Sequence, residues 1–511
     1  MNINKLQILS SSKTILFITL VVAIMPIISL PSMIDGISYI KVFVAAICVI
    51  PFLPFMVSKL FETKRGNMLW ILTVSILLVV LFSFFQIQND YRGLFGAPGR
   101  HNGTLAILLY LCFTIFGIYV YIKNSILVIM HGLVMSSSLT FLISNLHLIY
   151  PELSIFPSLD IGSSQFRDNV DNLAPLASMA FTASIILYLK SRNILYLILQ
   201  IPAVYFVIKW QLLQPIVAFI PSIILVTLKE RYMKLRFFAL TPLVVAVGYI
   251  SGIKLLPFTP FVMDSSIQER LRMITYLEEI WIHFSLFPIH IDALSDFSAS
   301  LEISGAYLDD FHNVYLQVLF SFGLVIGVAI IMLIAAPLLL STQQFNKTPY
   351  FFPVYFNFFL SLFFSIASPN YMYFGFILIG YFLGGTLSDA AGQLQSNKRE
   401  FGKNFVIYLA VVSILILQTH DFSKRMDVSS VTRAYSTELV DEKYFEKLLD
   451  KVSDIRDAEY KFQVARNFYS IGKCAYGNLV FEQLLSINTK EVRNAQLVEI
   501  RKSCEQRWLG K

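Results

Sequence analysis

Long runs of apolar residues recur along almost the whole chain, and they restrict its fold more than any other sequence feature. A helix needs about 20 apolar residues to cross the roughly 30 Å hydrocarbon core of a bilayer. Such runs must be helical because the bilayer core offers no water to backbone N–H and C=O groups. The sequence contains about thirteen runs of suitable length. They lie near residues 14–34, 38–58, 68–87, 104–122, 126–148, 172–189, 194–208, 212–228, 237–256, 313–340, 349–366, 371–387 and 404–419.

The composition is typical of an all-α polytopic membrane protein. Of the 511 residues, 56% are hydrophobic and 14% are charged, whereas soluble domains usually carry about 25% charged residues. A net charge of +7 would suggest nucleic-acid binding in a soluble protein, but we attribute it to basic cytoplasmic loops and expect no nucleic acid. The first apolar run lacks a small-x-small cleavage site before Asp35, so we expect it to remain as a membrane helix.

The distribution of lysine and arginine predicts the orientation and the division of the chain. With the N-terminus inside, the short basic loops lie in the cytoplasm, and the longer opposite loops hold fewer basic residues. The expected parts are N-terminal transmembrane helices (1–256), a long extracytoplasmic loop with an amphipathic helix (257–311), C-terminal transmembrane helices (312–420) and a soluble, extracytoplasmic helical domain (425–511).

The expected C-terminal domain is charged and rich in helix-forming residues. Some of its residues have spacings that resemble a tetratricopeptide helical hairpin, although a generic helical hairpin explains them equally well. These residues are Phe462, Tyr469, Gly472 and Phe481. Cys474 and Cys504 can form a disulfide if this domain lies outside the cytoplasm, but their spacing alone does not decide the pairing.

Sequence motifs argue against several classes of function. The chain has no Walker A pattern, which argues against an ATP-driven pump. It has no zinc-type pairing of histidine and glutamate and no cysteine cluster, so we expect neither a metal nor another cofactor. The polar residues that can carry chemistry lie in segments of the expected outer loops.

The first two of these segments precede the fourth and sixth expected spans. Arg92 and Arg100 lie in the glycine-rich segment 91-YRGLFGAPGRHNG-103. Paired arginines can bind a phosphate or a carboxylate through parallel hydrogen bonds, and the alternative is that they anchor the helix to lipid headgroups. In 166-FRDNVDN-172, Arg167 lies beside two aspartates, which we expect to cap the following helix.

The third segment, 265-SSIQERLRMITYLEEIW-281, contains Arg270 and Arg272. Its apolar residues recur every three or four positions, which predicts an amphipathic helix on the membrane surface. Either arginine can reach an anionic group at the outer membrane surface. The alternative is a solvated helix face on which the arginines pair with glutamates of the same helix.

The fourth segment is 309-DDFHNVYLQVLFSFGLVIG-327. Asp309 or Asp310 can cap the tenth span, which places His312 in or just before its first turn. The positive end of a helix dipole disfavours the imidazolium and keeps such a histidine able to accept a proton, whereas a neighbouring aspartate has the opposite effect. His312 is therefore either a general base or a cap residue.

Together, these segments resemble the O-antigen ligase and polymerase superfamily of bacterial membrane glycosyltransferases. The segments that carry the resemblance are 99-GRHNG-103, 169-NVDN-172, the arginine-led helix 270–281 that runs to Pro288, 309-DDFHNVYLQ-317 and 368-SPNYMYFGFILIGYFLG-384. The most specific feature is the pair His312 and Asn313, followed by an apolar helix with Gly323 and Gly327. The resemblance implies a GT-C-type ligase fold in the bacterial cytoplasmic (inner) membrane.

The resemblance also implies a reaction. Members of this family transfer a glycan from a polyprenyl diphosphate to a hydroxyl of a lipid, another glycan or a protein on the outer face of the membrane. His312 would be the base that activates the hydroxyl, while Arg272, Arg270 and Arg100 would bind the diphosphate without a metal. The residues expected to support this site are Asn313, Asp310, Arg92 and Arg167.

The sequence departs from the family in two segments. Many members have a Ser-Arg or Ser-Gln-Gly motif after the seventh span, whereas this chain has 209-KWQLLQP-215. Lys209 can replace an arginine in binding the diphosphate, but only as a point charge. The segment 288-PIHIDALSD-296 lacks the glycines of the family. The alternatives to glycan transfer are a transporter or flippase of lipid-linked sugars and a non-catalytic relative in glycan assembly. A transporter would carry charges near mid-span, and the expected spans have almost none.

Overall fold

Every regular element among the residues that the structure describes is a helix. The computed structural model describes residues 3–28, 38–62, 103–149, 170–209, 313–340, 351–363, 367–390, 472–485 and 491–506, with residues 311 and 365 and short pieces within 212–222 and 449–469. Within them, five helical segments are long and apolar enough to cross a membrane. These are Ile40–Val57, Leu105–Ile122, Ile126–Asn145, Leu173–Ser191 and Val314–Leu338. The chain is therefore a multi-pass membrane protein.

Four expected spans within the described residues form single helices with similar bounds. They are α6 (Thr104–Ile122), α7 (Ile126–Ile149), α9 (Val170–Ser191) and α18 (Pro369–Ala390). At the N-terminus, the elements are α1 (Ile3–Ile24), η1 (Met25–Ile27), α2 (Ser38–Val49), η2 (Ile50–Phe52) and α3 (Leu53–Glu62). The expected spans 68–87, 237–256 and 404–419 lie outside the described residues, so the count of about thirteen remains a prediction.

The second expected span is divided into α2, η2 and α3, and three later spans are also interrupted or shortened. The seventh is divided into α10 (Leu195–Ile198) and α11 (Ile201–Lys209). The eleventh, α17 (Phe352–Ser361), is shorter than the expected 349–366. The tenth, α16 (Val314–Leu340), contains a break at Gly323.

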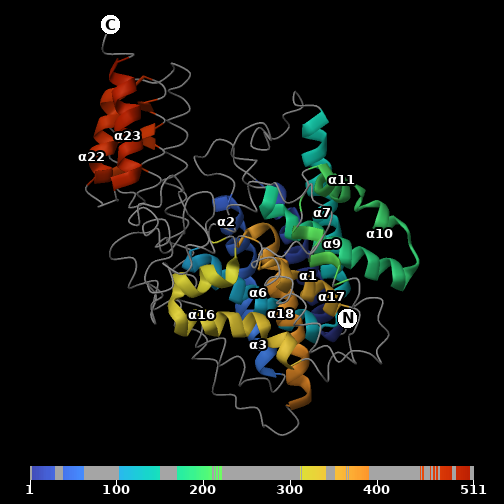
Figure 1. Cartoon of the computed structure of the whole chain (residues 1–511). Coiled ribbons are helices and arrows are strands. Elements are labelled where there is room, and N and C mark those ends of the chain that lie inside the picture. Colours follow the sequence, from blue (N-terminus) through green and yellow to red (C-terminus); the bar gives the residue numbers. More distant parts are fainter. Residues whose placement is uncertain are drawn as a thin grey trace.

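The break in α16 reverses the direction of the helix. Gly323 has a φ of 71° and a ψ of 167°, a conformation that glycine adopts without the steric penalty of a side chain. A Cβ at Gly327 would lie 2.8 Å from the Leu319 Cα, although residues eight apart in a straight helix are separated by about 12 Å. The element is therefore a hairpin of two arms, 314–322 and 324–340, which Figure 1 shows in yellow.

The closest helix pair in the described part of the chain is α6 on α18, at the centre of the assembly in Figure 1. A Cβ at Gly117 would overlap the Ile377 carbonyl oxygen, and one at Gly380 would overlap the Thr114 carbonyl oxygen. Small residues allow this close backbone approach in membrane helices. The ring of Tyr110 lies 5.7 Å from that of Tyr373 near the start of both helices, while later residues of α6 meet later residues of α18. The two helices therefore run parallel.

Buried side-chain hydrogen bonds join the helices around this pair. Asn357 of α17 accepts a hydrogen bond from Ser178 of α9 (2.7 Å) and donates one to Thr182 (3.1 Å). Ser137 of α7 donates to Gln200 between α10 and α11 (2.9 Å). These polar groups are buried, so satisfying them fixes how the helices align.

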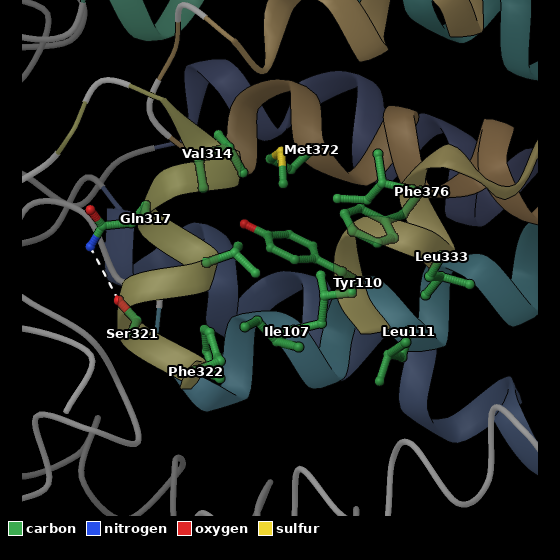
Figure 2. A pocket seen from close by; sticks show the side chains of 14 residues that line it. Ile107, Tyr110, Leu111, Val314, Gln317, Ser321, Phe322, Leu333, Met372 and Phe376 are labelled. Atoms are coloured by element: carbon green, nitrogen blue, oxygen red, sulfur yellow. Dashed lines mark hydrogen bonds between the residues drawn. The ribbon is translucent and has the colours of Figure 1, made fainter. Parts of the chain in front are cut away.

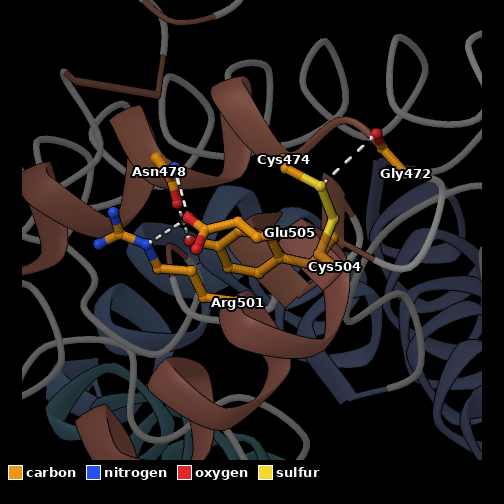
Figure 3. Close-up of a disulfide and its surroundings, with 7 residues drawn as sticks. Gly472, Cys474, Asn478, Arg501, Cys504 and Glu505 are labelled. Atoms are coloured by element: carbon orange, nitrogen blue, oxygen red, sulfur yellow. Dashed lines mark hydrogen bonds and ion pairs between the residues drawn. A yellow bond between two sulfur atoms is a disulfide. The ribbon is translucent and has the colours of Figure 1, made fainter. Parts of the chain in front are cut away.

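The C-terminal part contains the hairpin of α22 (Cys474–Leu485) and α23 (Glu491–Cys504). Figure 3 shows the disulfide that joins Cys474 to Cys504, with the two Cα atoms 6.0 Å apart. Near it, the Glu505 carboxylate accepts hydrogen bonds from Arg501 (2.9 Å) and Asn478 (3.4 Å). A Cβ at Gly477 would lie 2.5 Å from the Tyr469 ring. The structure thus contains the Cys474–Cys504 disulfide, which the spacing of the two cysteines did not decide. The tetratricopeptide assignment remains a prediction.

The α6–α18 contact predicts the effect of a larger side chain at its centre. Gly380→Leu should reduce stability by about 1–3 kcal/mol or more, because the new side chain must displace the Thr114 backbone. Thermal unfolding of the protein in detergent measures the loss. Ala329→Val, at an exposed position of α16, is the matched control. An unchanged melting temperature for Gly380→Leu would contradict the packing.

The disulfide predicts a change in gel mobility. Protein taken from native membranes under non-reducing conditions should migrate faster than the reduced protein, and Cys474→Ser should abolish the difference. Closing a loop of this length stabilises a hairpin by about 2–4 kcal/mol, so the variant should also be cleaved more readily by protease after α22. Cys112→Ala, which removes a buried free thiol, should leave both measurements unchanged.

Candidate functional site

The starts of α2, α6, α16 and α18 meet at one end of the described helices. The Val314 N–H at the start of α16 donates to the Leu362 carbonyl at the end of α17 (2.9 Å). Lys41 at the start of α2 donates to Asn370 at the start of α18 (2.7 Å), and α6 runs parallel to α18. Leu362 and Asn370, which make these contacts, bound a segment (362–370) that we call the α17–α18 connection. We refer to this region as the connection end.

The start of α16 is capped by Asn313. Its Oδ1 accepts hydrogen bonds from the backbone N–H groups of Tyr315 (3.0 Å) and Leu316 (3.1 Å). The expectation that Asp309 or Asp310 caps this helix is therefore wrong, because the helix begins at Val314 and the side chain directly before it satisfies the free N–H groups. His312 directly precedes the cap, as expected for a residue just before the first turn.

Gln317 holds the segment on the other side of His312. Its Oε1 accepts a hydrogen bond from the Phe311 N–H (3.3 Å), and its Nε2 donates to Ser321 (3.3 Å). Phe311 is buried and lies edge-on against Phe320, with ring centroids 5.5 Å apart. Both chain neighbours of His312 are thus fixed by hydrogen bonds to side chains.

The segment 209-KWQLLQP-215 reaches the connection end through Gln214. The Gln214 Nε2 donates to the Ser361 carbonyl at the end of α17 (3.4 Å). Gln214 is buried, and its Oε1 has no hydrogen-bond partner among the described residues. Lys209, the residue that the resemblance selected, lies on the exposed end of α11 with its Nζ 6.0 Å from the centroid of the Tyr205 ring.

Lys41 is a buried basic residue at the same end. It is 4% exposed, and its Nζ donates to the Pro26 carbonyl (3.1 Å) and to the Asn370 Oδ1 (2.7 Å). These contacts join η1, which follows α1, to the starts of α2 and α18. Lys41 is not among the site residues that the sequence motifs predict, although a lysine in the first turn of an apolar span is itself a signal.

An apolar cavity lies beside the first arm of α16, between α6, α18 and the second arm (Figure 2). Its volume is about 40 Å³, and Val314, Ile107, Met372 and Phe376 line it. The Tyr110 hydroxyl points into it, is buried and has no hydrogen-bond partner among the described residues. The cavity can hold an apolar group with a hydrogen-bond acceptor near Tyr110.

Most residues that the sequence selected lie outside the described part of the chain. They are His312, Asp310, Arg92, Arg100, Arg167, Arg270 and Arg272. Of the expected set, only Asn313 is brought to the connection end by described contacts. Within the described ranges, no group of three or more His, Cys, Asp or Glu side chains can hold a metal ion.

The hydrogen bond between Gln317 and the Phe311 N–H predicts how strongly the His312 segment is held. Gln317→Leu should leave this buried N–H unsatisfied, at a cost of about 1–3 kcal/mol. Hydrogen–deuterium exchange of a peptide that covers residues 309–317 should then be faster by about fivefold or more. Gln317→Glu retains an acceptor and should exchange like the wild type. Equal exchange rates for Gln317→Leu and the wild type would contradict a stabilising role for the hydrogen bond between Gln317 and the Phe311 N–H.

Comparison of the sequence with models of known protein families gave no match, and comparison with curated proteins gave none either.

Proposed function

We propose that the chain is a membrane glycosyltransferase of the O-antigen ligase or polysaccharide polymerase type. It would move a glycan from a polyprenyl diphosphate to an acceptor hydroxyl. The observation that carries the proposal is that two segments of the resemblance line one cavity: Val314 of 309-DDFHNVYLQ-317 lies there with Met372 and Phe376 of the later segment. The start of α16, which follows His312, is hydrogen-bonded to the α17–α18 connection, from which 368-SPNYMYFGFILIGYFLG-384 begins. An apolar cavity lies against both.

The proposed reaction requires one base and fixed cations. His312 accepts the proton of the acceptor hydroxyl, whose oxygen attacks the anomeric carbon of the glycan. The bond from that carbon to the diphosphate oxygen breaks, and Arg272, Arg270 and Arg100 stabilise the charge on the departing diphosphate. Asn313 and Gln317 contribute by fixing the chain on both sides of the base. The apolar cavity is suited to part of the prenyl chain.

The disulfide supports a site on the outer face of the membrane. Disulfides persist in oxidising compartments, which favours a periplasmic or extracellular C-terminal domain. In the expected topology, the last span ends on the side where α2, α6, α16 and α18 begin. The connection end would then face outward, where lipid-linked glycans are presented.

One structural feature favours the alternative of a transporter or flippase of lipid-linked sugars. The break at Gly323 makes α16 a discontinuous element, and broken helices often form transport sites. The buried groups at the connection end, however, lie at helix starts rather than at mid-span. We therefore retain glycan transfer as the main proposal.

The deciding experiment combines gene deletion with complementation by variants. Deletion should abolish attached or long-chain surface glycan, and His312→Ala should fail to restore it although the protein accumulates normally. The matched control is His131→Ala, because His131 lies near the start of α7, hydrogen-bonded to Leu127 and Tyr196, and has no place in the proposed reaction. Restoration of glycan by His312→Ala would refute the base assignment.

A further inference from the structure

Lys41 contacts only neutral oxygen atoms among the described residues. Its two acceptors are the Pro26 carbonyl and the Asn370 side-chain oxygen. An ammonium group has three N–H donors, so one remains for another partner. The described residues place no carboxylate within ion-pair distance of it.

A buried ammonium without a counter-charge is unfavourable. Neutral oxygens replace part of its hydration, but a buried lysine is held in its charged form only when an opposite charge approaches. A lysine that only anchors a helix to lipid headgroups extends its ammonium to the exposed membrane surface. Lys41 instead turns inward and is 4% exposed. Its position is therefore suited to an anion.

The surroundings of Lys41 indicate where this anion would lie. Asn370 belongs to the first turn of α18, and its N–H donates to the Ser368 hydroxyl in the α17–α18 connection (3.4 Å). In the same connection, the Leu362 carbonyl accepts the hydrogen bond from Val314, and the Ser361 carbonyl directly before it accepts the one from Gln214. The buried charge thus lies at the end of the helices where α16 begins.

We propose that Lys41 binds the diphosphate of a prenyl diphosphate, with Asn370 and the Pro26 carbonyl holding its ammonium in place. This inference rests on the proposed function and adds to it a cation outside the arginine segments. The shared chemistry is a lipid-borne phosphate, so the test must separate a prenyl diphosphate from a phospholipid headgroup.

Asn370→Asp is the sharpest test of this site, because the two side chains have nearly the same shape. The substitution places a carboxylate where the amide oxygen now lies 2.7 Å from the Lys41 Nζ. The internal ion pair would supply the missing negative charge. The free protein should then be as stable as the wild type or more stable, whereas the diphosphate should bind more weakly.

The measurement is thermal unfolding of the full-length protein in phosphatidylcholine nanodiscs. Farnesyl diphosphate should raise the melting temperature of the wild type, and farnesol, which lacks the charge, should not. Asn370→Asp should need at least about tenfold more farnesyl diphosphate for the same shift, which corresponds to about 1.4 kcal/mol of binding free energy. Lys41→Met should lose the shift as well, and Lys41→Arg should retain most of it.

Three results would overturn the assignment. Equal responses of the wild type and Asn370→Asp would show that Lys41 does not bind the diphosphate. An equal shift with phosphatidylglycerol would identify a membrane phospholipid as the ligand. No shift in the wild type, together with destabilisation by Asp35→Asn, would make Lys41 an internal ion-pair partner of Asp35, an acidic residue that lies outside the described ranges.

The binding measurement and the gene deletion test the Lys41 site and the proposed glycan transfer separately. If farnesyl diphosphate stabilises the wild type and the deletion strain keeps its surface glycan, the anion site stands and the proposed enzyme activity falls. If deletion removes the glycan and Lys41→Met still binds farnesyl diphosphate like the wild type, the enzyme stands and the Lys41 assignment falls.

Discussion

The close parallel packing of α6 on α18 is the contact on which the rest of the described structure depends. Gly117 and Gly380 let the two backbones approach until a single Cβ would overlap a carbonyl oxygen. Apolar side chains gain little by leaving lipid for a helix interface, so close packing of this kind holds membrane helices together. Because the two helices run parallel, their first turns lie at the same end. The start of α2 and the first arm of α16 join them there.

Helix ends at this place create a polar region inside an apolar protein. A helix that stops within a membrane protein leaves backbone N–H and C=O groups without partners, and hydrocarbon cannot satisfy them. Here Asn313 and Gln317 bind N–H groups at the start of α16, while Gln214 and Val314 bind carbonyl groups at the end of α17. The same region can therefore hold ordered polar groups for binding and chemistry.

The connection end also explains why the two proposals belong together. A prenyl diphosphate has an apolar chain and a charged head, and the described residues offer an apolar cavity and a buried ammonium at neighbouring helix starts. Neither feature alone identifies a substrate, since cavities and buried lysines each have structural roles. Their occurrence at one end of the same helices favours an amphipathic anionic ligand.

The sequence by itself determined that the described apolar runs are helical, because backbone N–H and C=O groups in a bilayer core need partners within the same segment. It predicted α6 (Thr104–Ile122) at its observed bounds. It also located the histidine segment directly before α16, although it selected an aspartate where Asn313 is the cap. The arginines of its candidate site lie outside the described residues, so their positions remain predictions.

Only the tertiary structure decided the hairpin in α16, the partners of Lys41 and the pairing of Cys474 with Cys504. A glycine in an apolar run is compatible with a straight or a broken helix, and contacts with distant helices select one of them. Lys41 meets Asn370 across 329 residues of sequence, a separation over which local pattern carries no information. The physical reason is the same throughout: apolar length fixes which segments are helices, whereas specific packing and hydrogen bonds fix which polar groups meet.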